Sequence, residues 1–103
     1  MGMDLYISRY KNRRTPNEIS EELYYARKFW NLLDASFVRG YQDDCYVCAP
    51  IYCRENMDEL IQIAIREPDF FGSYQTVPKL CEIRDEIEAG IEEGWSYYLE
   101  ADW

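Results

Sequence analysis

Within the twelve residues Glu92–Trp103, EEGWSYYLEADW, apolar and more polar side chains alternate from Trp95 to Trp103. Period-two alternation is typical of a β-strand with one buried face, whereas a loose chain end is usually polar. Residues 95–103 are therefore predicted to form a strand whose aromatic side chains belong to the hydrophobic core. The side chains predicted to face inward are Trp95, Tyr97, Leu99, Ala101 and Trp103.

Residues 2–8 alternate in the same way, with apolar side chains at Met3, Leu5 and Ile7. A strand with one apolar face must bury that face against another element. Two such strands in a small chain are natural neighbours. We therefore predict that residues 2–8 and 95–103 lie in one sheet.

Residues 17–40 carry an apolar stripe at alternating spacings of four and three, which is typical of an amphipathic helix of about six turns. Pro16 and Asn17 are suitable residues for the start of a helix, and Gly40 is suitable for its end. A first helix is therefore predicted here. Its buried stripe consists of Ile19, Leu23, Ala26, Trp30, Leu33 and Phe37.

The middle of the chain predicts another strand and a second helix. Residues 46–52 are predicted to form a short or edge strand, because Pro50 cannot donate a backbone hydrogen bond to a neighbouring strand. The second helix is predicted from Arg54 to Arg66, and Pro68 follows it. It is predicted to bury Met57, Leu60, Ile61 and Ala64.

A loop over residues 68–77 and a third helix from about Pro78 to Gly94 complete the prediction. The third helix is predicted to bury Leu80, Ile83, Ile87 and Ile91. The order is then β-α-β-α-α-β. We predict an α+β fold in which three helices pack on a small, mostly antiparallel sheet, with the first and last strands in the same sheet.

The length and composition are those of one globular unit. A chain of 103 residues has room for a single domain, residues 1–103, and its 48% hydrophobic and 30% charged residues argue against disorder. No apolar run reaches the roughly 20 residues that span a bilayer, and no segment has the pattern of a signal peptide. We expect a cytoplasmic protein with no membrane partner.

The net charge of -9 is unevenly distributed. Residues 1–40 carry seven basic and five acidic side chains, whereas residues 41–103 carry four basic and fifteen acidic ones. Because the second part repels phosphate, direct binding of nucleic acid is not expected. The basic cluster Arg9, Lys11, Arg13 and Arg14 is interpreted as a solvated strand end and loop.

The chain contains no histidine. This excludes Ser-His and Cys-His nucleophile pairs, histidine acid–base catalysis and histidine metal sites. The sequence also has no phosphate-binding glycine loop and no calcium-loop spacing. We therefore predict a protein that is not an enzyme and that needs no cofactor, with carboxylate or tyrosine chemistry as the alternative.

Four cysteines admit three interpretations: a zinc site, a disulfide or free thiols. Cys45 and Cys48 are three residues apart, so a strand would place them on opposite faces. Disulfides are rare in cytoplasmic proteins. Free thiols without a metal are the interpretation we favour for Cys45, Cys48, Cys53 and Cys81.

Acidic residues cover the outward side of the predicted third helix. Like charges four residues apart destabilise a helix, and a helix optimised only for solubility would interleave lysines. This face either keeps the protein soluble or binds a basic surface of a protein that normally holds nucleic acid. The candidate partner-binding residues are Glu82, Asp85, Glu86, Glu88, Glu92 and Glu93.

Four short segments together resemble a family of small, uncharacterised bacteriophage and prophage proteins. They are GMDLY at 2–6, EELYYARK at 21–28, FFGS at 70–73 and a closing YY…W formed by Tyr97, Tyr98 and Trp103. Ala26 stands where members of that family often carry an aromatic residue. The resemblance covers nearly the whole chain and implies a phage setting, but it implies no catalytic residues.

A small, acidic phage protein without catalytic groups has the profile of anti-CRISPR and anti-restriction inhibitors, some of which mimic the charge of DNA. We therefore expect a non-catalytic binding protein that blocks a host nucleic-acid-binding defence complex. The alternative is a phage accessory or assembly protein that binds another protein through exposed aromatic side chains. The tyrosines expected to serve that alternative are Tyr6, Tyr24 and Tyr98.

Overall fold

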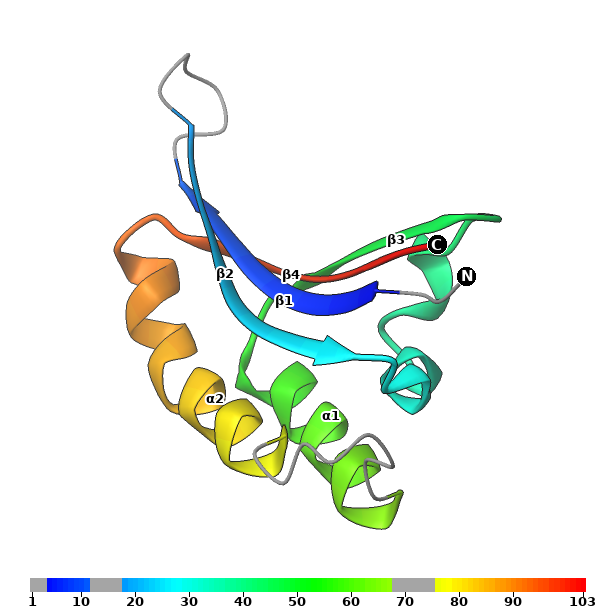
Figure 1. Ribbon diagram of the computed structural model, residues 1–103. Helices are drawn as coiled ribbons and strands as arrows, with labels where there is room; N and C mark the ends of the chain where they lie inside the picture. Colours follow the sequence, from blue (N-terminus) through cyan, green and yellow to red (C-terminus); the bar gives the residue numbers. More distant parts are fainter. Residues whose placement is uncertain (1–3, 12–17, 68–75) are drawn as a thin grey trace.

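The computed structural model describes residues 4–11, 18–67 and 76–103. Within these ranges the fold is α+β, with a four-stranded antiparallel sheet and two α-helices on one of its faces (Figure 1). The elements are β1 (Asp4–Lys11), β2 (Ile19–Arg27), the 3-10 helices η1 (Trp30–Asp34) and η2 (Arg39–Tyr41), β3 (Tyr46–Ile51), α1 (Arg54–Arg66), α2 (Thr76–Glu92) and β4 (Ser96–Asp102).

The strands that begin and end the described chain form the centre of the sheet, whose order is β2-β1-β4-β3. β1 and β4 are antiparallel neighbours, with Leu5 opposite Ala101 and Ile7 opposite Leu99. This confirms the pairing that their shared alternation predicts. β3 lies at one edge, as Pro50 indicated, and β2 lies at the other.

The core lies between the sheet and the two helices. β1, β4 and β3 each turn alternate apolar side chains toward α1 and α2, and these side chains are buried. Burying one such Leu, Ile or Val side chain contributes about 1.5–3 kcal/mol relative to leaving it in water. The helix α1 has the predicted bounds, and its four predicted core residues Met57, Leu60, Ile61 and Ala64 are buried.

The prediction of three helices in the order β-α-β-α-α-β is wrong, because residues 19–27 form a strand. The described elements follow the order β-β-β-α-α-β. β2 pairs with β1 over its whole length, and the ion pair between Arg9 and Glu21 joins the two strands. Arg27 has a φ of 53°, which a right-handed helix cannot contain, so the backbone turns away after β2. The proposed start of the helix at Pro16 and Asn17 lies outside the described residues.

Residues 26–41 use a three-residue period instead of a helical one. The backbone N–H of each buried residue from Phe29 to Val38 donates to the carbonyl of the buried residue three positions earlier. Three residues per turn is the period of a 3-10 helix, which places every third side chain on one side. That buried series is Ala26, Phe29, Leu32, Ala35 and Val38. Of the expected stripe, Ile19 is 49% and Trp30 is 54% exposed.

α2 begins at Thr76, two residues before Pro78, which is tolerated in the first helical turn because its missing N–H has no partner there. Leu80, Ile83 and Ile87 are buried as predicted, but Ile91 is 39% exposed. Gly90 faces the sheet in its place. A Cβ at residue 90 would lie 1.8 Å from the hydroxyl oxygen of Tyr97, so only glycine lets α2 approach β4 this closely.

The predictions for Trp103 and for the loop after the second helix have different outcomes. Trp103 was expected in the core but is 49% exposed, because β4 ends at Asp102. The loop predicted over residues 68–77 is wrong at Thr76 and Val77, which belong to α2, and residues 68–75, with FFGS, lie outside the described residues. Within the described residues, neither α1 nor α2 combines the length and the apolar character that crossing a bilayer requires.

Candidate functional site

All six predicted partner-binding carboxylates are exposed on or just after α2. We call this surface the acidic face: Glu82, Asp85, Glu86, Glu88, Glu92 and Glu93. α2 forms part of the outer layer of the fold, so one side of the helix packs on the sheet and the other faces solvent (Figure 1). The structure thus brings the candidate residues together along one helix.

Basic side chains neutralise only the first part of the acidic face. Lys79 Nζ lies 3.2 Å from Glu82, and Arg84 lies 3.3 Å from both Asp85 and Asp58 of α1. Within the parts of the chain that the structure describes, no ion pair involves the four acidic residues nearer the end of α2. Those four are Glu86, Glu88, Glu92 and Glu93.

The opposite face of the sheet carries a feature that the sequence did not predict, a carboxylate buried among hydroxyl groups. Glu100 of β4 is 2% exposed. Its carboxylate accepts hydrogen bonds from the hydroxyls of Ser8, Tyr10 and Tyr46, at 2.9 Å for Tyr10 and 2.7 Å for Tyr46. The thiol of Cys48 lies 3.8 Å away as a fourth donor. We call these five residues the Glu100 cluster.

The donors of the Glu100 cluster come from both strands that flank β4. Because positions two apart share a face, β1 supplies Ser8 and Tyr10, while β3 supplies Tyr46 and Cys48. A carboxylate has about four lone-pair sites, and four donors point at this one. Among the described residues, Glu100 forms no ion pair, so these hydrogen bonds are what offsets its burial.

The tyrosines around Glu100 hold their protons strongly. Burial, followed by the charge of Glu100, raises the pKa of Tyr6 to about 12. Burial and the hydrogen bond to Glu100 raise the pKa of Tyr46, and burial raises that of Tyr10. A general acid or base works best with a pKa near the operating pH. These tyrosines, with their raised pKa values, are therefore suited to donating hydrogen bonds rather than to transferring protons near neutral pH.

We expect the protein to lose stability as the pH rises from about 10 toward about 12. Unfolded tyrosines lose their protons near pH 10, whereas folded Tyr6 keeps its proton to about pH 12. The folded state then binds more protons than the unfolded state, so the stabilisation is complete below pH ~10 and is lost above it. Urea midpoints measured from about pH 8 to 11.5 test this. Tyr6→Phe should make the decline shallower, and an unchanged slope would contradict the assignment.

Arg9 and Lys11, the two residues of the basic cluster that the structure describes, both contact other side chains. The Arg9 guanidinium lies 4.0 Å from the ring centroid of Trp95, and Lys11 Nζ lies 5.4 Å from it. Arg9 also lies 2.6 Å from Glu21. These contacts fit the interpretation of a strand end, while Arg13 and Arg14 lie outside the described residues.

The four cysteines are free thiols in the structure. Cys45 is exposed, and Cys48, Cys53 and Cys81 are half-buried. Cys45 precedes β3, whereas Cys48 lies within it. Within the described residues, no three Cys, Asp or Glu side chains are arranged to hold a metal ion.

The tyrosines expected to be exposed are only half-exposed. Tyr6 and Tyr98 flank the Glu100 cluster, and Tyr24 shares a hydrogen bond of 2.9 Å with Thr76 of α2. The more exposed aromatic side chains are Tyr25, Trp30, Tyr41, Tyr46, Tyr52 and Trp103, with Tyr52 reaching 68%.

None of the protein-family models, curated proteins or solved structures with which the chain was compared matches it.

Proposed function

We propose that this chain is a non-catalytic binding protein of a phage, which blocks a host defence complex by occupying its basic, nucleic-acid-binding surface. One observation supports the proposal most. All six carboxylates of the acidic face are exposed, and four of them form no ion pair with a described residue. A basic partner can supply the missing positive charge.

The arrangement fits competition with nucleic acid. Side chains three and four residues apart on a helix lie about 5–6 Å from each other, which is within the range of successive phosphates along a strand. Surface carboxylates also keep most of their hydration, so binding through them depends mainly on long-range electrostatic attraction. That attraction raises the rate of association. Such binding weakens as salt screens the charges.

The alternative, an accessory or assembly protein that binds through aromatic side chains, is favoured by one observation. Tyr52 is 68% exposed at the end of β3, and Tyr41 is 46% exposed. Tyrosine is enriched at the energetic centres of protein interfaces. Binding through these side chains would depend little on salt, so salt dependence separates the two functions.

Reversing the charge of Glu82, Asp85, Glu86 and Glu93 to lysine is expected to abolish partner binding. All four side chains are exposed, so the fold should persist. The test is affinity capture from host lysate at about 50 mM salt, with bound protein eluted by added duplex DNA. The wild-type protein should capture a nucleic-acid-binding protein that DNA displaces, and capture should fail at about 500 mM salt.

A matched control changes the net charge equally at sites away from α2. Reversal of Glu22, Asp34, Asp44 and Glu67 to lysine also alters four exposed side chains. This control should capture the partner nearly as well as the wild type. Two results would refute the proposal: equal loss in both variants, or capture that neither DNA nor salt disturbs.

A further inference from the structure

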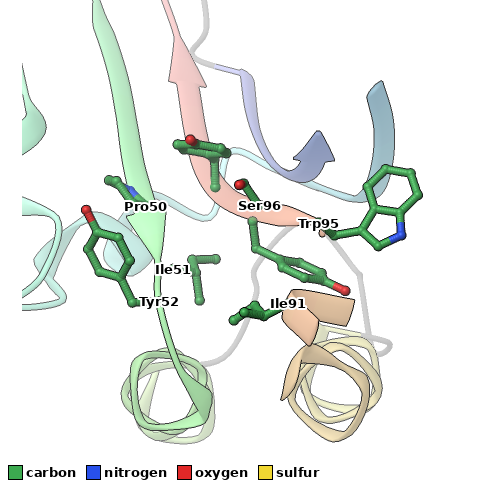
Figure 2. A pocket seen from close by; sticks show the side chains of 8 residues that line it. Pro50, Ile51, Tyr52, Ile91, Trp95 and Ser96 are labelled. Atoms are coloured by element: carbon green, nitrogen blue, oxygen red, sulfur yellow. The ribbon is translucent and has the colours of Figure 1, made fainter. Parts of the chain in front are cut away.

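A pocket of about 140 Å³ lies between the end of β3 and the last turn of α2. Pro50 and Tyr52 border it from the β3 side, and Ile91 borders it from α2 (Figure 2). The buried side chains Ile51 and Tyr97 line it as well, so its inner wall is fixed by the core. The remaining lining residues are Trp95, Ser96 and Tyr98.

The size of the pocket selects a single side chain as its occupant. A cavity of about 150 Å³ holds a benzene-sized molecule, whereas sites for cofactors and drug-sized ligands measure about 300–1,000 Å³. A bound amphipathic helix would need a long groove for several anchors at helical spacing. The pocket has room for one anchor, which excludes both a cofactor and a helix.

The surroundings favour an extended segment of polyproline type. Tyrosine rings and Pro50 border the pocket, and aromatic-lined grooves bind proline segments because such segments are already extended and lose little entropy. Addition of a strand to β3 is disfavoured. The carbonyl of Tyr46 already accepts from the N–H of Asp43, Gln42 bridges to Val47, and Pro50 has no N–H to offer.

The charges beside the pocket call for a basic neighbour. Glu88 lies three residues before Ile91, and therefore on the same side of α2, while Glu92 lies four residues after Glu88 and neighbours it on the helix surface. Both carboxylates are exposed and form no ion pair with a described residue. On the β3 side, the chain continues from Tyr52 to Arg54, whose positive charge would repel a basic residue of the ligand. A basic residue of the ligand should therefore lie over α2, next to Glu88 and Glu92.

We propose that this pocket binds one proline side chain of an extended segment of the partner, and that Glu88 and Glu92 bind an adjacent arginine or lysine of the same segment. The inference rests on the proposed function, because the segment is taken to belong to the same basic partner that the acidic face binds. It adds a short-range, apolar anchor to the long-range attraction of the acidic face. The residues that would carry it, Ile91, Tyr52, Glu88 and Glu92, do not overlap with the four reversed above.

The probe is a capped hexapeptide that contains two prolines followed by an arginine. Binding is measured by NMR from the δ1-methyl resonances of the isoleucines. The Ile91 resonance should shift and saturate with peptide, while that of Ile65, 57% exposed on α1, should not move. Replacing the arginine by glutamate should weaken binding about two- to fivefold, and replacing the prolines by alanine should abolish the shift.

Matched variants test the two halves of the proposal. Ile91→Lys should weaken binding more than about tenfold, because it removes an apolar wall and adds a repulsive charge, whereas Ile65→Lys should bind as the wild type. Glu88→Lys together with Glu92→Lys should reverse the preference for arginine over glutamate. No shift of Ile91 at millimolar peptide, or equal binding by Ile91→Lys, would overturn the proposal.

The outcome is separable from that of the charge-reversal experiment. If the peptide fails to bind while the four-residue reversal still abolishes capture, the pocket inference is wrong and the proposed function stands. If the peptide binds as expected while the reversed variant captures its partner normally, the proposed function is wrong and the pocket stands as a separate docking site.

Discussion

Removal of residues 100–103 is expected to leave the protein unfolded. β4 is a central strand, and these residues pair with β1 on one side and with β3 on the other. The deletion removes the buried Glu100 and Ala101 and leaves the facing parts of both neighbours without a partner. Unpaired backbone groups and lost burial together should exceed the 5–15 kcal/mol that stabilises a typical domain. Circular dichroism should show no cooperative thermal transition.

A shorter deletion serves as the control. Trp103 lies beyond β4 and is 49% exposed. Its backbone N–H donates a hydrogen bond to the carbonyl of Cys45, with 3.2 Å between nitrogen and oxygen. Removing Trp103 alone should lower the melting temperature by only a few degrees, since a net hydrogen bond contributes about 1 kcal/mol. A protein that lacks residues 100–103 and still melts at the wild-type temperature would refute the role assigned to β4.

The alternation of β1 and β4 could be predicted because strands at the centre of the sheet have one face buried against the helices. Leu5, Ile7, Tyr97 and Leu99 are buried for that reason. The helix α1 could be predicted because its four predicted core residues repeat at helical spacing and Pro68 follows its end. In both segments, the local pattern and the tertiary environment agree.

The segment 17–40 could not be predicted because two periods compete within it. Spacings of four and three connect Ile19 to Phe37, but a period of three connects Ala26 to Val38. Pairing with β1 and contact with α1 decide between them, and both depend on residues far away in the sequence. Tertiary contacts of this kind routinely override local propensity.

Of the two candidate sites, one could be predicted from the sequence and the other could not. The acidic face could be predicted because helical geometry alone places its carboxylates outward. The Glu100 cluster could not, because its donors come from strands whose positions next to β4 only the sheet order reveals. One signal was present in the sequence: Tyr6, Ser8 and Tyr10 share a face of β1, as Tyr98 and Glu100 share a face of β4.

Glu100→Ala is expected to lower the free energy of unfolding by about 2–4 kcal/mol. Ser8 is 4% exposed, so its hydroxyl would lose its acceptor without gaining access to water, which costs about 1–3 kcal/mol. The deleted side chain also leaves a cavity. Tyr10 and Tyr46 are less buried and can turn toward water, and relief from burying a charge offsets part of the loss. Urea unfolding at neutral pH measures the difference.

Two variants separate the hydrogen bonds of Glu100 from its volume. Glu100→Gln keeps the shape and one acceptor oxygen, but its amide donates where a hydroxyl now donates, so it should cost about half as much as Glu100→Ala. Asp102→Ala, at an exposed position of the same strand, should change the stability by less than about 0.5 kcal/mol. If Glu100→Ala were as stable as the wild type, the cluster would not be what holds β1, β4 and β3 together on this face. Their cohesion would then come from the backbone hydrogen bonds of the sheet and from the helix-facing core.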